Sequence, residues 1–121
     1  MDSLSILIAE DEAVIAMLLG EVLVSLGHSI CASVATADEA VVAALAHNPD
    51  LIIIDAGLRD SSGMDAIAEI TKTAPVAHIF ISGNKAAVLA KRPTALVIEK
   101  PFDEEMLIAT MDIAINTLPL K

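Results

Sequence analysis

The sequence predicts a doubly wound α/β fold, in which a five-stranded parallel sheet carries helices on both faces. Short apolar runs alternate five times with segments of helical periodicity along the 121 residues. The run at 51–54 is apolar at every position, as in the centre of a parallel sheet. Strands that alternate with helices indicate a parallel sheet, and the helical connections in such a sheet are right-handed crossovers.

The first half of the chain supplies three of the strands. Residues 5–9 and 29–34 are predicted strands, and a helix over 12–26 lies between them with Gly27 at its end. A buried central strand follows at 51–55. The buried stripe predicted for the 12–26 helix consists of Ile15, Leu18, Leu19, Val22 and Leu26.

The second helix begins with a capping box. Thr36 and Glu39 have the spacing at which a hydroxyl and a carboxylate satisfy the free backbone donors of a helix start. The helix is predicted to run to about His47, because Pro49 disfavours helical backbone just before it.

The second half of the chain repeats the alternation. We expect a helix that Asp103 caps at the end of the chain, with Phe102 and Leu107 forming a hydrophobic staple around the cap. The buried stripe of that helix is predicted to be Leu107, Met111, Ala114 and Leu118. The other predicted elements are helices at 62–73 and 84–91 and strands at 78–82 and 94–99.

Composition limits the possible functions. The chain is 55% hydrophobic with two Phe and no Trp or Tyr, so aliphatic side chains must form the core. With 17 acidic and 7 basic residues its net charge is −10, which disfavours direct nucleic-acid binding and binding to an anionic membrane. Cys31 is the only cysteine, which excludes an intrachain disulfide. Because no apolar run reaches membrane-span length and the N-terminus lacks a basic signal region, we expect a cytoplasmic protein of one domain, residues 1–121.

Polar residues follow four of the predicted strands. Glu10 and Asp11 follow the first strand, Asp55 ends the third, Ser82 ends the fourth and Lys100 follows the fifth. In an open α/β sheet, ligands bind beyond the carboxyl ends of the strands. We therefore expect these side chains to form one site.

Each of these residues has an ordinary explanation when it is taken singly. A carboxylate can cap a helix, a serine can belong to a turn and a lysine can be a surface charge. Their joint placement at the ends of four strands is not explained in this way. Three close carboxylates repel one another, and a hard cation such as Mg²⁺ removes the conflict. Lys100 supplies a positive charge, and Ser82 a hydrogen-bond donor, for a phosphoryl group.

Four motifs resemble the receiver domains of two-component signalling, and the resemblance extends from Ile6 to about Leu118. It implies a flavodoxin-like fold with strand order 2-1-3-4-5. The motifs are Ile6-Leu-Ile-Ala-Glu10-Asp11-Glu12, Asp50-Leu-Ile-Ile-Ile-Asp55 followed by Leu58 and Gly63, Phe80-Ile-Ser82-Gly83, and Glu99-Lys100-Pro101-Phe102.

The resemblance implies a role for each site residue. Asp55 would accept a phosphoryl group from the phosphohistidine of a kinase or a phosphotransfer protein. Mg²⁺ would bind Asp11, Asp55 and the Gly57 carbonyl, with Glu10 acting through a metal-bound water. Lys100 would pair with Asp55 and then with the phosphate, while Ser82 would contact a phosphate oxygen. The Lys100–Pro101 peptide bond would be cis. Such a switch would act through protein partners and is not a conventional turnover enzyme.

The chain departs from the family pattern in three places. Val97 stands where an aromatic residue usually changes its packing as the signal passes, and Arg59 replaces the usual proline after the acceptor. The interval from Ser82 to Lys100, 100 − 82 = 18 positions, is short, so the fourth helix should be short or irregular. The pattern resembles a minority branch of receivers, and the usual readout and dimer face are in question.

Two alternatives remain open at this point. One is a degenerate receiver that serves only as a binding module, which the complete set of site residues disfavours. The other is an aspartyl-phosphate hydrolase, which needs a second Asp where Gly57 stands.

Overall fold

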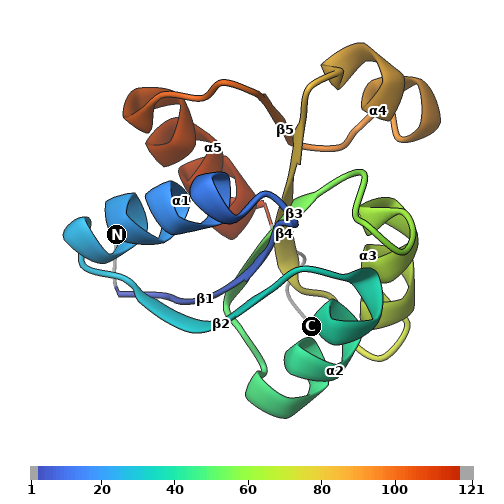
Figure 1. The fold of residues 1–121 in the computed structure, drawn as a ribbon, viewed down its shortest axis with the longest axis horizontal. Coiled ribbons are helices and arrows are strands. Elements are labelled where there is room, and N and C mark those ends of the chain that lie inside the picture. Colours follow the sequence, from blue (N-terminus) through green and yellow to red (C-terminus); the bar gives the residue numbers. More distant parts are fainter. Residues whose placement is uncertain (1–2, 118–121) are drawn as a thin grey trace.

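The structure, a computed structural model, describes residues 3–117, in which five parallel strands form a single sheet in the order β2-β1-β3-β4-β5. The predicted fold class and strand order are confirmed. Helices α1 and α5 cover one face, and α2, α3 and α4 lie on the other (Figure 1). The strands are β1 (Ser5–Ala9), β2 (Ser29–Val34), β3 (Leu51–Asp55), β4 (Ala77–Ser82) and β5 (Val97–Glu99), and the helices are α1 (Ala13–Ser25), α2 (Ala37–His47), α3 (Gly63–Thr71), α4 (Lys85–Lys91) and α5 (Glu104–Asn116).

The core consists of two aliphatic layers that share the strands. Alternate residues of one strand point to opposite faces, so Ile52 and Ile54 pack in the layer under α2 and α3, whereas Leu51 and Ile53 pack under α1 and α5. All five residues of β3 are buried, as predicted for a central strand. Phe80 is fully buried in the layer under α2 and α3. Each face of the sheet therefore positions its own helices.

The helix caps follow the sequence prediction in most details. The Thr36 hydroxyl accepts a hydrogen bond from Glu39 N at 3.1 Å, and the Glu39 carboxylate accepts one from Ala35 N at 3.3 Å. Asp103 caps α5 through Met106 N at 2.7 Å. Phe102 packs against the core layer that contains Leu107, so the predicted staple residues belong to one layer.

Two expectations about individual elements were wrong. The predicted strand 94–99 is a strand only over Val97–Glu99, because Ala95 N bonds to the Arg92 carbonyl and closes a turn there. Leu18 of the predicted α1 stripe is 48% exposed, and Leu23 is buried instead. In an almost wholly apolar helix, periodicity does not identify the buried face. The predicted stripe residue Leu118 lies outside the described residues.

Other boundaries shift by one or two residues. Helix α3 ends at Thr71 rather than Thr73, with Ser62 as its N-cap, and α4 is short, as expected, with its Asn84 cap. Over residues 3–117, no helix combines the length and the apolar character that crossing a bilayer requires.

Gly63 lies where α3 starts directly against β3. A Cβ atom at this position would collide with the Asp55 carbonyl oxygen, and it would lie 3.0 Å from the carbonyl carbon and 3.1 Å from Ile54 Cγ1. These neighbours belong to the central strand and cannot move freely. A glycine is therefore required for α3 to begin where it does.

We predict that Gly63→Ala lowers the free energy of unfolding by about 2 kcal/mol or more, because the strand and helix must separate. The matched variant is Gly20→Ala in the middle of α1, where the new Cβ would lie 3.9 Å from Ile8 Cδ1 in ordinary contact. That change should stabilise the protein by about 0.5–1 kcal/mol, since alanine favours helix. Urea unfolding followed by circular dichroism measures both. Equal effects of the two variants would contradict the steric argument.

Candidate functional site

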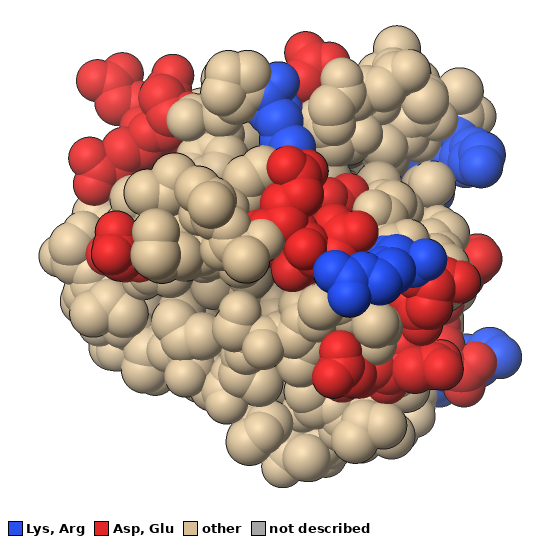
Figure 2. All heavy atoms as spheres, in the orientation of Figure 1, with Lys and Arg blue, Asp and Glu red and all other residues tan. Residues whose placement is uncertain are grey.

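Four strand ends bring their polar residues together at the carboxyl edge of the sheet. Glu10, Asp11 and Glu12 form the loop between β1 and α1, and Asp55 is the last residue of β3. The strands β1 and β3 are hydrogen-bonded neighbours, which sets the acidic loop beside Asp55. Figure 2 shows acidic side chains gathered over this edge, with basic side chains next to them.

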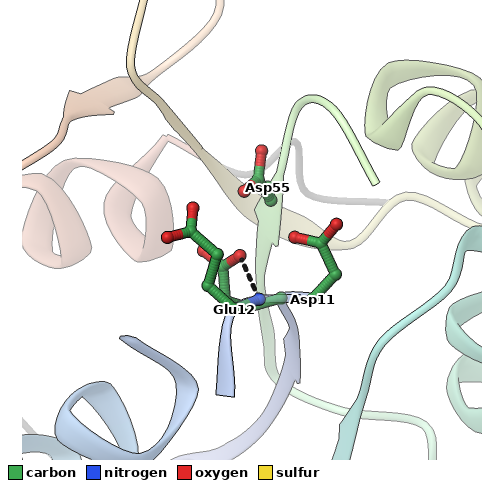
Figure 3. A group of neighbouring side chains, drawn as sticks. Asp11, Glu12 and Asp55 are labelled. Atoms are coloured by element: carbon green, nitrogen blue, oxygen red, sulfur yellow. Dashed lines mark hydrogen bonds between the residues drawn. The ribbon is translucent and has the colours of Figure 1, made fainter. Parts of the chain in front are cut away.

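Four carboxylates form a compact cluster. Glu10, Asp11, Glu12 and Asp55 each offer a carboxylate oxygen, and these oxygens all lie within 4.8 Å of one another. Figure 3 shows Asp55 facing Asp11 and Glu12 across the space between the two loops. Like charges at this separation repel strongly unless a cation lies among them.

Lys100 is the cation that reaches this cluster. Its Nζ lies 2.7 Å from Asp55 Oδ2, 3.0 Å from Glu12 Oε1 and 3.0 Å from Glu10 Oε1. Burial by itself would lower the pKa of Lys100. The hydrogen bonds to Asp55 and Glu12 and the close contact with the Glu10 carboxylate outweigh burial and raise that pKa above its ordinary value. One ammonium then faces four carboxylates.

Glu10 is the most deeply buried carboxylate of the cluster. Its side chain is fully buried, and Oε2 accepts a hydrogen bond from Glu12 N at 3.1 Å. Oε1 is close to Lys100 Nζ, yet it receives no well-directed hydrogen bond from the described residues. Loss of hydration on burial raises the pKa of Glu10 to about 7, and the neighbouring Asp55 acts in the same direction. The ionised form of Glu10 is thus costly here.

The donor set fits a hard divalent cation. Carboxylate and carbonyl oxygens are the ligands that Mg²⁺ prefers, and the buried Glu10 Oε1 lies 3.0 Å from Lys100 Nζ without a well-directed hydrogen bond. Gly57 is exposed, and no hydrogen bond from residues 3–117 reaches its carbonyl oxygen. Asp55 Oδ1 accepts a hydrogen bond from Gly57 N at 2.9 Å, which holds the Asp55 side chain against the start of the β3–α3 loop.

Ser82 lies beside Asp55 at the same edge of the sheet. Asp55 is paired with Ile81 of β4, so Ser82 is one residue beyond Asp55 in register. The Ser82 hydroxyl accepts a hydrogen bond from Asn84 N at 2.9 Å, and no hydrogen bond joins it to the carboxylates. The sequence placed this residue at the edge but did not indicate its bond to the start of α4.

The remaining predicted site residues lie in β5 and directly after it. Val97 is buried in the layer that contains Phe80 and Val88. The peptide bond between Lys100 and Pro101 is cis.

Sequence reasoning gave no site role to two residues that contact this region. Glu12 was interpreted only as the start of a helix, although its position directly after Glu10-Asp11 was a signal. Asp60 lies on the surface, and its carboxylate also accepts hydrogen bonds from the first turn of α2. The signal for Asp60 is absent from the local sequence, because its partners lie 22 and 23 residues away.

Comparison with known proteins agrees with the resemblance to receiver domains. The family model of the response regulator receiver domain matches residues 6–112. The chain is 43% identical over 101 residues to the phyllosphere-induced regulator PhyR of Methylorubrum extorquens, an alignment that covers 80% of this chain and 38% of that protein. It is 34% identical over 115 residues to the transcriptional regulatory protein PdtaR of Mycobacterium tuberculosis, covering 92% of this chain and 56% of that protein.

Solved structures are similar over nearly the whole chain. The PhyR receiver (REC) domain of Erythrobacter litoralis superposes with a TM-score of 0.89 at 33% identity, covering 100% of this chain and 96% of that one. PhyR of Brucella abortus gives 0.88 at 30% identity, covering 95% of this chain and 49% of that one. The chain therefore spans about half of PdtaR and of the Brucella PhyR, and 38% of the Methylorubrum PhyR.

The pKa of Glu10 predicts how stability depends on pH. A carboxyl group whose pKa rises on folding, here from 4.5 to about 7, binds its proton more tightly in the folded state. Stability is then lost as pH rises from about 4.5 to about 7. We predict that Glu10→Gln raises the free energy of unfolding of the metal-free protein at pH 8 by roughly 1–3 kcal/mol, and that the gain disappears near pH 4.5.

Urea unfolding in the presence of a chelator, followed by circular dichroism, measures this effect. Glu21→Gln on the exposed surface of α1 is the control for loss of one negative charge, and it should change little at either pH. The explanation fails if Glu10→Gln has the same effect at both pH values.

Proposed function

Because the chain belongs to the response regulator receiver family, we propose that it is a phospho-acceptor switch in a two-component phosphorelay, with Asp55 as the phosphorylated residue. Receivers are signalling proteins and not conventional turnover enzymes. The observation that carries the proposal is Asp55 at the end of β3, 2.7 Å from Lys100 and among three further carboxylates. We further propose that residues 1–121 act as one receiver unit.

The proposed reaction uses the Asp55 carboxylate as a nucleophile. An Asp55 oxygen attacks the phosphorus of a phosphohistidine on a kinase or phosphotransfer protein. An O–P bond forms as the N–P bond breaks, and the electron pair returns to the imidazole nitrogen. The product is an acyl phosphate, which water hydrolyses in time and so resets the switch. Such transfers have loose transition states, so positioning and charge neutralisation supply most of the catalysis.

We propose Mg²⁺ as the cofactor, held by Asp11, Asp55 and the Gly57 carbonyl, with Glu10 acting through water. When bound, Mg²⁺ neutralises carboxylate charge and the charge of the transferring phosphoryl group. Two observations support this assignment: Glu10 Oε1 receives no well-directed hydrogen bond, and no hydrogen bond from the described part of the chain reaches the Gly57 carbonyl. Asp55 Oδ1 already receives the Gly57 N–H, which orients the acceptor before a donor arrives.

Lys100 and Ser82 would stabilise the phosphorylated state. Lys100 would exchange part of its contact with Asp55 for a contact with a phosphoryl oxygen. The Ser82 hydroxyl is accepting from Asn84 N, which leaves its own proton free to donate to the phosphoryl group. Because Val97 lacks an aromatic ring, we propose that the signal leaves through the hydrogen bonds at the start of α4 and reaches a protein partner.

Intact-mass measurement after incubation with acetyl phosphate and Mg²⁺ tests the acceptor. We expect a gain of about 80 daltons, the mass of one phosphoryl group, in the parent protein and none in Asp55→Asn. Asp65→Asn removes the same charge from the first turn of α3 and should keep the gain. No gain with any donor would leave only a binding module, and turnover of unrelated phosphate esters would favour a hydrolase.

A second variant tests the link between phosphorylation and output. Lys100→Ala should leave the fold intact, because Lys100 lies at the sheet edge and not in either core layer. Phosphorylation should shift the amide resonances of α4 and β5 in the parent protein but not in this variant, as seen by nuclear magnetic resonance. Loss of the folded circular dichroism spectrum would instead make Lys100 a structural residue.

A further inference from the structure

Asp60 joins the loop after the acceptor to a different helix. Its Oδ1 accepts a hydrogen bond from Ala37 N at 2.7 Å and its Oδ2 one from Asp38 N at 3.3 Å. Thr36 caps the next amide, Glu39 N, at 3.1 Å. The free backbone donors at the start of α2 are therefore shared between the residue before the helix and a carboxylate of the β3–α3 loop.

The rest of this loop bonds mainly to itself. Gly57 N bonds to the Asp55 carboxylate, Leu58 N bonds to the Ser61 carbonyl at 3.0 Å, and Gly63 N bonds to the Ala56 carbonyl at 2.8 Å. Leu58 is buried and fixes one side of the loop in the core. Among the hydrogen bonds of residues 57–61 in the described chain, the two at Asp60 are those that reach an element other than the adjoining β3 and α3.

The charge at Asp60 is favourable in this position. The N–H of Ala37, followed by that of Asp38, holds the pKa of the Asp60 carboxyl below its ordinary value, so the group is ionised at neutral pH. A negative charge at a helix start also interacts favourably with the helix dipole. These bonds remain effective although the side chain is exposed, because charge-assisted hydrogen bonds are stronger than neutral ones.

We infer that Asp60 is a positioning residue of the phospho-acceptor site, which holds the β3–α3 loop against α2 and thereby fixes the Gly57 carbonyl. Gly57 is three residues from Asp60 and two from Asp55. Because Asp55 is held in the buried strand β3, movement of the loop would displace the Gly57 carbonyl relative to the Asp55 carboxylate, and both would bind Mg²⁺. The inference rests on the proposed function. It adds that α2 contributes to the site through the loop, without a side chain of its own there.

Two substitutions of Asp60 separate the tether from the charge. Asp60→Ala removes both acceptors, whereas Asp60→Asn keeps one carbonyl oxygen for the 2.7 Å bond to Ala37 N. If the tether positions the loop, the Mg²⁺ concentration that half-saturates phosphorylation by acetyl phosphate should rise about tenfold in Asp60→Ala and less in Asp60→Asn. The rate at saturating Mg²⁺ should stay within about twofold of the parent rate. Asp65→Ala and Asp65→Asn are the matched controls, because no hydrogen bond to the Asp65 side chain is found within residues 3–117, and they should leave the half-saturating concentration unchanged.

Amide hydrogen exchange in the metal-free protein tests the tether itself. We expect faster exchange at Ala37 N and Asp38 N in Asp60→Ala, with Glu39 N still protected by Thr36. Unchanged exchange at Ala37 and Asp38 would overturn the inference, because the bonds would not persist in solution. Faster exchange with an unchanged Mg²⁺ requirement would also overturn it, since Asp60 would then only cap α2.

These outcomes are separable from a failure of the proposed function. If Asp55 accepts no phosphoryl group, Mg²⁺ binding followed by calorimetry replaces the rate measurement, with the same expected order of the variants. A circular dichroism spectrum confirms that each variant is folded, and Asp60→Asn serves where Asp60→Ala does not fold.

Discussion

The crowding of four carboxylates around one ammonium at the sheet edge is the constraint on which the site depends. Carboxylates whose oxygens lie within 4.8 Å of one another repel, and Lys100 contacts three of the four groups. Burial of Glu10 raises its pKa, and the neighbouring Asp55 adds to this effect. Added positive charge stabilises such a cluster. The carboxyl edge of the sheet should therefore respond to a bound cation and to any change of charge at Asp55.

The sheet is what keeps the carboxylates together despite their repulsion. β3 is buried over its whole length, and its neighbours β1 and β4 present aliphatic side chains to both helical layers. A strand that is packed on both faces cannot move Asp55 away from Glu10 without opening the core. Gly63 adds to this rigidity, because α3 starts in contact with the backbone of Asp55. The stability of the core thus sustains an electrostatically unfavourable arrangement at its rim.

The sequence predicted the fold and the main site because both follow from local patterns. Alternating apolar runs locate the strands, and the rule that parallel strands end at one edge brings Glu10, Asp55 and Lys100 together. It could not predict which side of α1 is buried, since Leu18 and Leu23 are chemically alike and only tertiary packing distinguishes them. It could not predict the Asp60 bonds to α2 either, because they join loops that are distant in sequence. The fifth strand was overextended, since a turn at Arg92 and Ala95 overrides the β-type pattern at residues 94–96.

The end of β5 shows how a receiver can be built without an aromatic switch residue. Val97 is packed in the core and has few rotamers. It also lacks a ring that could move between the core and the surface. The connections to α4 are instead hydrogen bonds from strand ends: Ser82 Oγ accepts from Asn84 N, and Glu99 Oε2 accepts from Lys85 N at 3.1 Å. Arg92 caps the other end of α4. Its guanidinium donates a hydrogen bond to the Met64 carbonyl of α3 at 3.1 Å, and its Cζ lies over the Phe80 ring, 5.7 Å from the ring centroid. Both ends of this short helix are thus held by directional contacts to neighbouring elements. The Ser82 hydroxyl bonds directly to the N-cap residue of α4, so no further side chain separates this strand end from the start of the helix.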